Sequence, residues 1–189
     1  MRVGVVGATG QVGGVMRRLL EERDFPVTEM RYFASARSAG TTLPWKGTDI
    51  VVEDAEIADP SGLDIALFSA GATSSRAYAD KFAAAGAVVI DNSSAWRMDP
   101  DVPLIVPEVN GHMIHEHKKR NIIANPNCST IQMVMALKPL HDAAAVKRVV
   151  VSTYQSVSGA GKAAMDELFN QTKGIFVNDA VTREEFTKQ

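Results

Sequence analysis

The sequence predicts an α/β fold: a Rossmann-type doubly wound parallel sheet, followed by the incomplete start of an α+β domain. Short runs of apolar and β-branched residues alternate with stretches of helical spacing along most of the chain. Several of these runs are almost continuously apolar, as parallel strands covered on both faces require. A glycine triplet also follows the first run directly, where a dinucleotide-binding turn is expected.

Composition limits the classes of function. Of the 189 residues, 46% are hydrophobic and 22% charged, which is typical of a globular protein. The net charge of −2 gives no bulk attraction to nucleic acid or to an anionic membrane, so neither is expected as a partner. The apolar N-terminal run is too short to span a bilayer and leads into the glycine motif. A lone cysteine excludes an internal disulfide and predicts a cytoplasmic protein.

The elements are expected in alternating order. The predicted strands are Val3–Val6, Met30–Phe33, Ile50–Glu53, Ile65–Phe68, Val88–Ile90, Ile122–Ala124 and Val149–Tyr154. The predicted helices are Gln11–Glu22, Ser74–Ala85, Ser129–His141 and Lys162–Gln171. Three prolines make Asp99–Met113 a loop and crossover, and the alanine-rich Asp142–Val146 is expected to be a helix end and turn.

A domain boundary is expected near Asn125–Cys128. Residues 1–127 would form an NADP-binding Rossmann-type domain, and residues 128–189 the incomplete start of a catalytic and dimerisation domain. The second part supplies one long strand, Val149–Tyr154, and one helix, which cannot close a second layer. That strand would keep an open edge, so we expect a truncated chain or a fragment that tends to self-associate.

The glycine motif VGVVGATGQVGG predicts a dinucleotide site. Gly7 can make the tight turn after the strand, and Gly10 lets backbone N–H groups approach a pyrophosphate at the helix N-terminus. Gly13 allows the helix to pack closely on the sheet. An NAD site usually has an acidic residue at the end of the second strand. Here Ser35, Arg37 and Ser38 stand there instead, and their donors suit a 2′-phosphate, so we expect NADP.

The only cysteine, Cys128, lies in NIIANPNCST between a strand and a helix. A buried structural thiol is the common role of a lone cysteine. Pro126 ends the strand, however, and Ser129 or Thr130 is expected to cap the helix. The helix N-terminus would stabilise a thiolate, and its N–H groups with the Asn127 amide could hold an oxyanion. Thiohemiacetal chemistry with hydride transfer to a nicotinamide follows from that arrangement.

Five motifs together resemble the aspartate-semialdehyde dehydrogenase family. They are GATGQVG, SARSAG, DNSSAWRMDPDVPLIVPEVN, NIIANPNCST and YQSVSGAGKAAMDEL, and the likeness runs from Arg2 to about Val177. It implies reversible NADP-dependent reductive dephosphorylation of L-aspartyl 4-phosphate to L-aspartate 4-semialdehyde, on the route to lysine, threonine, methionine and diaminopimelate. It also implies a homo-oligomer, a homodimer, for the full-length protein.

The resemblance assigns roles to individual residues. Cys128 matches the acyl-thioester nucleophile, Arg97 the arginine that holds phosphate, and Gln155 a residue that contacts substrate. The positions that match cofactor contacts are Thr9, Gly10, Gln11, Val12, Arg37, Ser38, Ser158 and Gly159. Gly71 and Asn92 end neighbouring strands at the carboxyl edge of the sheet, where such sheets bind ligands.

Some family residues have no counterpart here. The family's acid/base histidine, its carboxylate-binding arginine and a phosphate-site lysine would lie beyond residue 189. The segment HMIHEHKKR spaces three histidines, but it is expected to be a solvated helix or turn with no metal, and Lys118–Arg120 a solvated basic turn. Two alternatives stay open: N-acetylglutamyl-phosphate reductase, which the sequence around Cys128 disfavours, and a catalytically silent NADP-binding partner subunit.

Overall fold

The computed structural model describes residues 1–177 of the chain. Residues 1–147 form one compact unit, and a second unit begins at Arg148. Each unit is described by itself. The division into functional domains at residue 127 stays a prediction.

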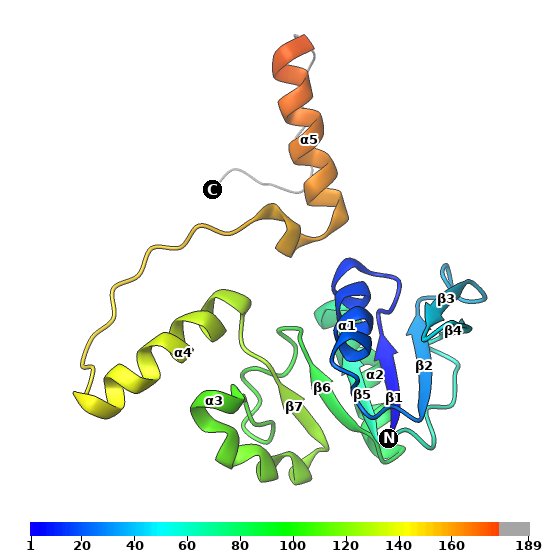
Figure 1. Ribbon diagram of the computed structural model, residues 1–189, viewed down its shortest axis with the longest axis horizontal. Helices are drawn as coiled ribbons and strands as arrows, with labels where there is room; N and C mark the ends of the chain where they lie inside the picture. The colour runs from blue at the N-terminus through cyan, green and yellow to red at the C-terminus, as the bar shows by residue number, and fades with distance from the viewer. Residues whose placement is uncertain (178–189) are drawn as a thin grey trace. The chain divides into compact units, whose positions relative to one another are not determined.

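The first unit is built on a seven-stranded sheet with the order β3-β4-β2-β1-β5-β6-β7 (Figure 1). The strands are β1 (Arg2–Val6), β2 (Glu29–Ala34), β3 (Thr42–Trp45), β4 (Thr48–Asp54), β5 (Ile65–Phe68), β6 (Val88–Asp91) and β7 (Ile122–Ala124). All neighbours pair in parallel except β3, which is antiparallel to β4. The predicted doubly wound parallel sheet is therefore confirmed.

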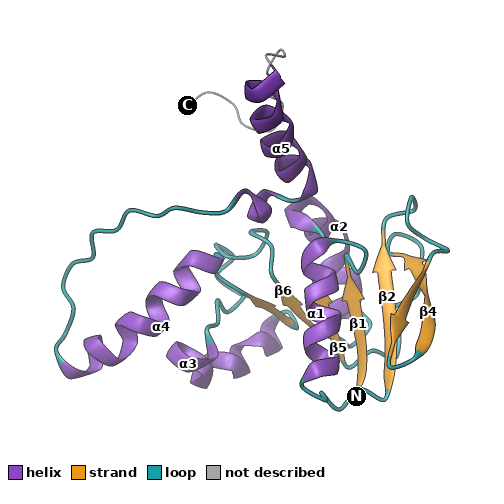
Figure 2. Cartoon of the chain, turned by 45° about the horizontal axis from the view of Figure 1, so that its top comes forward, coloured by secondary structure: helices purple, strands orange, loops and turns teal. Residues whose placement is uncertain are grey.

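Helices connect the strands on both faces of the sheet. α1 (Gln11–Glu22) joins β1 to β2, and α2 (Gly71–Ala84) joins β5 to β6. α3 (Pro107–Asn110) and the 3-10 helix η1 (Gly111–Lys119) lie between β6 and β7, and α4 (Cys128–Ala143) follows β7. Figure 2 shows α1 and α2 on opposite faces of the strands. The second unit contains a 3-10 turn, η2 (Val157–Ala160), and helix α5 (Lys162–Val177). Among the described residues, no helix is long and apolar enough to cross a membrane.

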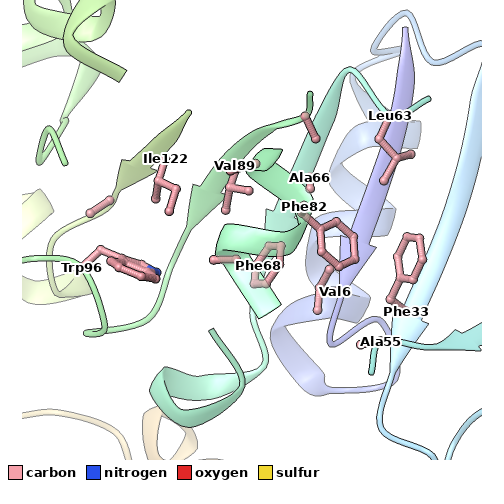
Figure 3. Packing of buried hydrophobic residues seen from close by; sticks show 14 of the residues in the cluster. Val6, Phe33, Ala55, Leu63, Ala66, Phe68, Phe82, Val89, Trp96 and Ile122 are labelled. Carbon is pink, nitrogen blue, oxygen red and sulfur yellow. The ribbon is translucent and has the colours of Figure 1, made fainter. Parts of the chain in front are cut away.

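The strands bury alternate residues in two separate cores. Val3, Val5 and Tyr32 belong to the cluster that Leu20 of α1 covers, and all three are at most 1% exposed. The opposite face contributes Val6, Phe33 and Phe68 to a larger cluster with Phe82 of α2, where the aromatic rings meet edge to face. Figure 3 shows this second cluster running from Phe33 and Leu63 at one end to Trp96 and Ile122 at the other. Burial on both faces explains why these strands are almost continuously apolar.

Six predicted strands are confirmed. The predicted loop Asp99–Met113 is wrong in its second half, where Pro107 stands in the first turn of α3 and η1 begins at Gly111. The strand β3 was also missed. β3 contains Pro44, which cannot donate a hydrogen bond to a neighbouring strand, so this segment carries little strand signal. Its position at the edge of the sheet makes the proline acceptable, since only β4 pairs with it.

The predicted strand Val149–Tyr154 is wrong. This segment is extended but forms no strand, and Val150 is 81% exposed. A β-rich sequence becomes a strand only when a neighbour satisfies its N–H and C=O groups, and no described part of its unit does so. The open strand edge expected there, and the self-association argued from it, therefore lose their basis.

Candidate active site

One cleft lies where the order of the strands reverses direction across the sheet. β1 has β2 on one side and β5 on the other, and such a switch point opens a crevice beyond the carboxyl ends of the strands. A cleft of about 360 Å³ occupies this position. Its lining residues come from the ends of four strands and from α2: Val6, Gly7, Thr9, Gly10, Ala34, Ser35, Ala55, Ser69, Ala70, Ser74 and Tyr78.

Two glycines of the predicted motif are required by close backbone contacts. Gly7 has a φ of +85°, and a Cβ there would lie 2.4 Å from the Ser69 carbonyl oxygen. A Cβ on Gly13 would lie 2.2 Å from the Gly7 carbonyl oxygen. The tight turn and the close helix packing expected from the sequence are thus both present. Gly10 caps α1 without a side chain, so the first N–H groups of the helix border the cleft.

The predicted 2′-phosphate residues follow β2. Ser35 lines the cleft, and the backbone then turns so that the Ser38 N–H donates to the Ser35 carbonyl oxygen at 2.8 Å. Arg37 is exposed in this turn and makes no ion pair with any described residue. A guanidinium in this state is available to an anionic ligand at the rim of the cleft.

The cysteine occupies the first turn of α4. Asn127 is the N-cap, and its side-chain Oδ1 accepts a hydrogen bond from the Ser129 N–H at 3.0 Å. The expected cap by Ser129 or Thr130 is therefore wrong: an asparagine is as good a cap as serine, and it begins the helix earlier. Cys128 is exposed, with Sγ 4.0 Å from Asn127 Oδ1. The thiol is thus accessible at a helix N-terminus, and not buried in a core.

Arg97 is anchored between two strand ends. Its Nε donates to the Asn125 carbonyl oxygen at 2.8 Å, and its Nη2 donates to the Asn92 carbonyl oxygen at 3.2 Å. Asn92 directly follows β6, and Asn125 directly follows β7. The guanidinium therefore lies at the carboxyl edge of the sheet, on the loop that follows β6 and beside Asn125 in the segment that leads to Cys128. No hydrogen bond joins its Nη1 to residues 1–177.

The remaining predicted residues divide between the two units. Gly71 is the first residue of α2, next to the cleft residue Ala70. Gln11 and Val12 begin α1 and are exposed. The second unit holds the other three, Gln155, Ser158 and Gly159. Within it the predicted turn before a helix is present as η2, where the Ser156 side chain accepts from the Ser158 N–H.

The histidine segment is a surface helix, as expected. η1 carries His112 and His115 on exposed positions, and the His115 ring contacts the carbonyl oxygen of His112 at 2.9 Å. Arg120 differs from the predicted solvated turn. It bonds Asp80 and Asp99 at 2.7 Å each, because the fold brings these distant carboxylates together.

Sequence reasoning missed several residues near the cleft. Ser69, Ser74 and Tyr78 line it, and Asp91 lies buried at the end of β6. The available signal was their place directly after a strand or in the first turns of the following helix. Many other polar residues occupy such positions, so the sequence alone could not distinguish these four residues from them.

Comparison with known proteins supports this arrangement. The family described as "Semialdehyde dehydrogenase, NAD binding domain" matches residues 2–117, and "Semialdehyde dehydrogenase, dimerisation domain" matches residues 137–189. An aspartate-semialdehyde dehydrogenase of Aquifex aeolicus is 60% identical over 173 residues, which cover 91% of this chain and 51% of that protein.

Solved structures are also similar. The crystal structure of aspartate semialdehyde dehydrogenase II complexed with ASA from Vibrio cholerae has a TM-score of 0.95 and 50% identity, covering all of this chain and 56% of that one. The Candida albicans enzyme with NADP has a TM-score of 0.64 and 32% identity, covering 77% of this chain and 48% of that one. The chain thus spans about half the length of the relatives it matches. With a family match over more than half of its residues and this fold, the chain belongs to the semialdehyde dehydrogenase family, and residues 2–117 are its NAD-binding domain.

Proposed function

We propose that the full-length protein is an aspartate-semialdehyde dehydrogenase. It would convert L-aspartyl 4-phosphate reversibly to L-aspartate 4-semialdehyde and phosphate, using NADP. The observation that carries this proposal is the exposed Cys128 thiol at the N-terminus of α4, at the same carboxyl edge of the sheet as the glycine cleft and Arg97. The names of the relatives above support aspartate semialdehyde as the substrate over an N-acetylated glutamyl compound.

The cleft fits a dinucleotide with a 2′-phosphate. Gly7 and Gly13 leave a cradle that any Cβ would fill, and the N–H groups of the first turn of α1 suit the pyrophosphate. Ser35, Arg37 and Ser38 would hold the 2′-phosphate, where an acidic residue would repel it. When bound, NADP supplies the hydride acceptor and donor of the reaction.

Cys128 would carry the covalent chemistry. In the oxidative direction its thiolate attacks the aldehyde carbon and forms a C–S bond, and loss of hydride from that carbon leaves a thioester. Phosphate then attacks the thioester carbonyl and releases the thiolate, which gives the acyl phosphate. The N–H groups at the start of α4 and the Asn127 amide are placed to stabilise the oxyanion formed in each addition.

Arg97 would bind the phosphate that enters this step. Two of its nitrogen atoms are committed to carbonyl oxygens, which orients the guanidinium and leaves Nη1 for a phosphate oxygen. Gln155 would contact the substrate, and Ser158 and Gly159 the cofactor, once the second unit takes its place in the full-length protein. The match to a dimerisation domain supports a homo-oligomer, and the lone cysteine is in keeping with the cytoplasm.

The test compares the full-length protein with its Cys128→Ala and Cys128→Ser variants. NADPH formation from aspartate semialdehyde and phosphate is measured, together with NADPH binding by fluorescence. We expect both variants to bind NADPH normally and to lose turnover, because neither side chain forms a thioester. A full-length protein that binds NADPH without any turnover would instead support the silent partner subunit. Turnover with the N-acetylated glutamyl substrate alone would support the reductase.

A further inference from the structure

A buried carboxylate lies directly under the loop that carries Arg97. Asp91, the last residue of β6, is 0% exposed. Its Oδ2 accepts hydrogen bonds from the Ser75 and Ser93 hydroxyls at 2.8 and 2.7 Å, and its Oδ1 accepts from the Ser93 N–H at 2.9 Å. These are neutral donors that converge on one buried carboxylate. Burial of such a group is costly unless its lone pairs are satisfied, so the network holds its members in one geometry.

The network reaches the residue next to Arg97. Ser75 is 1% exposed on α2, and its hydroxyl oxygen accepts a hydrogen bond from Trp96 Nε1 at 2.8 Å while it donates to Asp91. The indole ring is itself buried at 7% exposure, at the end of the large core cluster (Figure 3). Trp96 is therefore oriented by a hydrogen bond at its edge, in addition to packing.

Arg120 also contacts the same ring. Its guanidinium carbon lies 4.6 Å from the centre of the Trp96 ring, and it bonds Asp99 on the same loop and Asp80 on α2. The Asp99 N–H also donates to the Trp96 carbonyl oxygen at 3.0 Å. The backbone on both sides of Arg97 is thereby fixed, which leaves its side chain a single direction across the ends of β6 and β7.

We infer that the Asp91–Ser75–Trp96 relay is a positioning device for Arg97, and that it sets the affinity of the site for the phosphate group. This inference rests on the proposed function, since it assigns the phosphate to Arg97. None of the three relay residues touches the phosphate in this account. Each acts through the loop that holds the guanidinium against the Asn125 carbonyl oxygen, in the segment that leads to Cys128.

The test uses the full-length protein and a double-mutant cycle. Ser75→Ala removes the centre of the relay, and Trp96→Phe keeps a buried ring but removes the Nε1 donor. Loss of one such buried hydrogen bond corresponds to roughly a 3- to 10-fold rise in the KM for phosphate. We expect the KM for aspartate semialdehyde and the dissociation constant of NADPH to change less than about twofold. Arg97→Ala should raise the KM for phosphate further, and Ser75→Ala added to it should have no additional effect.

Controls separate positioning from a loss of stability. Val52→Ala truncates a buried residue of β4 in the other core cluster, so it lowers the thermal midpoint without touching the relay. It should leave the KM for phosphate unchanged. The inference is overturned if the Ser75 and Trp96 variants leave this KM unchanged, or if Ser75→Ala acts equally with and without Arg97. If Arg97→Ala leaves the KM for phosphate unchanged, the proposed role of Arg97 fails as well. If Arg97→Ala raises this KM and the relay variants do not, only the positioning inference fails.

Discussion

Two arginines of the site are prepared for anions in opposite ways. Arg97 is partly buried, and two backbone carbonyl oxygens fix its guanidinium before any ligand arrives. Arg37 lies exposed in a turn without an ion-pair partner among the described residues. A fixed guanidinium loses little conformational entropy on binding, so it can also orient a reacting group, whereas a mobile one contributes mainly attraction. This difference agrees with the proposed roles, in which Arg97 binds the phosphate that reacts and Arg37 binds the 2′-phosphate of the cofactor.

At the residue scale, we predict that Arg37→Ala weakens NADPH binding by about 10- to 100-fold, since a charge-assisted hydrogen bond contributes about 1.5–3 kcal/mol. NADH binding should change little, because NADH lacks the 2′-phosphate. Fluorescence titration of both cofactors measures the difference. Arg18→Ala, which removes an exposed arginine from α1, is the control and should affect neither cofactor. Equal losses for NADPH and NADH would refute the assignment of Arg37.

At the scale of elements, β1 and α1 approach so closely that only glycine fits between them. The Gly13 Cα faces the Gly7 carbonyl oxygen and the Ala8 Cα, which are backbone atoms and cannot rotate away. The same contact brings the N-terminus of α1 against the cleft. Packing of α1 and the proposed binding of the dinucleotide therefore both depend on the close approach of Gly13 to the Gly7 carbonyl oxygen.

We predict that Gly13→Ala destabilises the chain by about 1–3 kcal/mol and abolishes high-affinity NADPH binding, because the new methyl group would push α1 off the sheet. Gly14→Ala is a matched control in the same helix. A Cβ there would meet only the Arg17 Nη2 at 3.8 Å, so alanine should be neutral or stabilising by up to about 1 kcal/mol. Urea unfolding and NADPH titration measure both effects. Similar stability for the two variants would contradict the proposed packing.

A second element-scale contact ties the starts of β1 and β5 together. Asp64 Oδ2 accepts from the Arg2 N–H at 2.7 Å, and the Arg2 side chain bonds the other carboxylate oxygen. The backbone hydrogen bond from Arg2, and then its side chain, lower the pKa of Asp64 below its ordinary value of 3.8. A carboxylate with a lowered pKa contributes stability above its unfolded value, and that contribution is lost as the pH falls through the folded value.

We therefore predict that Asp64→Asn lowers the free energy of unfolding at pH 7, and that its difference from the unmodified chain shrinks as the pH falls below about 4. Urea unfolding at pH 7, 4 and 3 gives this comparison. Asp49→Asn, on β4, serves as a control for the loss of one negative charge. If the difference in the free energy of unfolding between Asp64→Asn and the unmodified chain stays constant down to pH 3, the charge of Asp64 does not contribute to stability.

At the scale of the whole molecule, the 189-residue chain holds the dinucleotide cleft, the thiol and Arg97, but none of its described histidines lies near the thiol. His141 stands almost four turns further along α4, about 20 Å from the start of the helix. The others lie on η1, which precedes the amino end of β7, whereas Cys128 follows its carboxyl end. A group that moves the proton during thiol addition is thus not supplied by these residues.

We predict that the purified 189-residue chain binds NADPH but shows no detectable turnover of aspartate semialdehyde, whereas the full-length protein does. The cleft lies within the first unit, where it is formed by residues at the ends of β1, β2, β4 and β5 and on α2. Binding should be weaker than in the full-length protein, where Ser158 and Gly159 of the second unit would add cofactor contacts. Steady-state kinetics with matched NADPH titrations measure this. Robust turnover by the 189-residue chain would show that its active site is already complete.

The sequence by itself determined the features that depend on neighbours along the chain. The apolar runs, the bounds of α1, the glycine turn and the polar turn after β2 follow from local spacing, and all were predicted before any contact was known. Cys128 was singled out in the same way, from its place between a strand and a helix, whereas Arg97 was singled out by the resemblance of its motif to the family.

Only the tertiary structure decided what depends on partners distant in sequence. Val149–Tyr154 has strand composition, but no described residue of its unit forms a strand that could pair with it. β3 is a strand despite Pro44 because β4 pairs with it at the edge of the sheet. Asp91 and Arg120 gain their partners only when folding brings Ser75 to Asp91 and brings Trp96, Asp80 and Asp99 to Arg120. A hydrogen bond or ion pair needs both groups in place, and a linear pattern specifies only one of them.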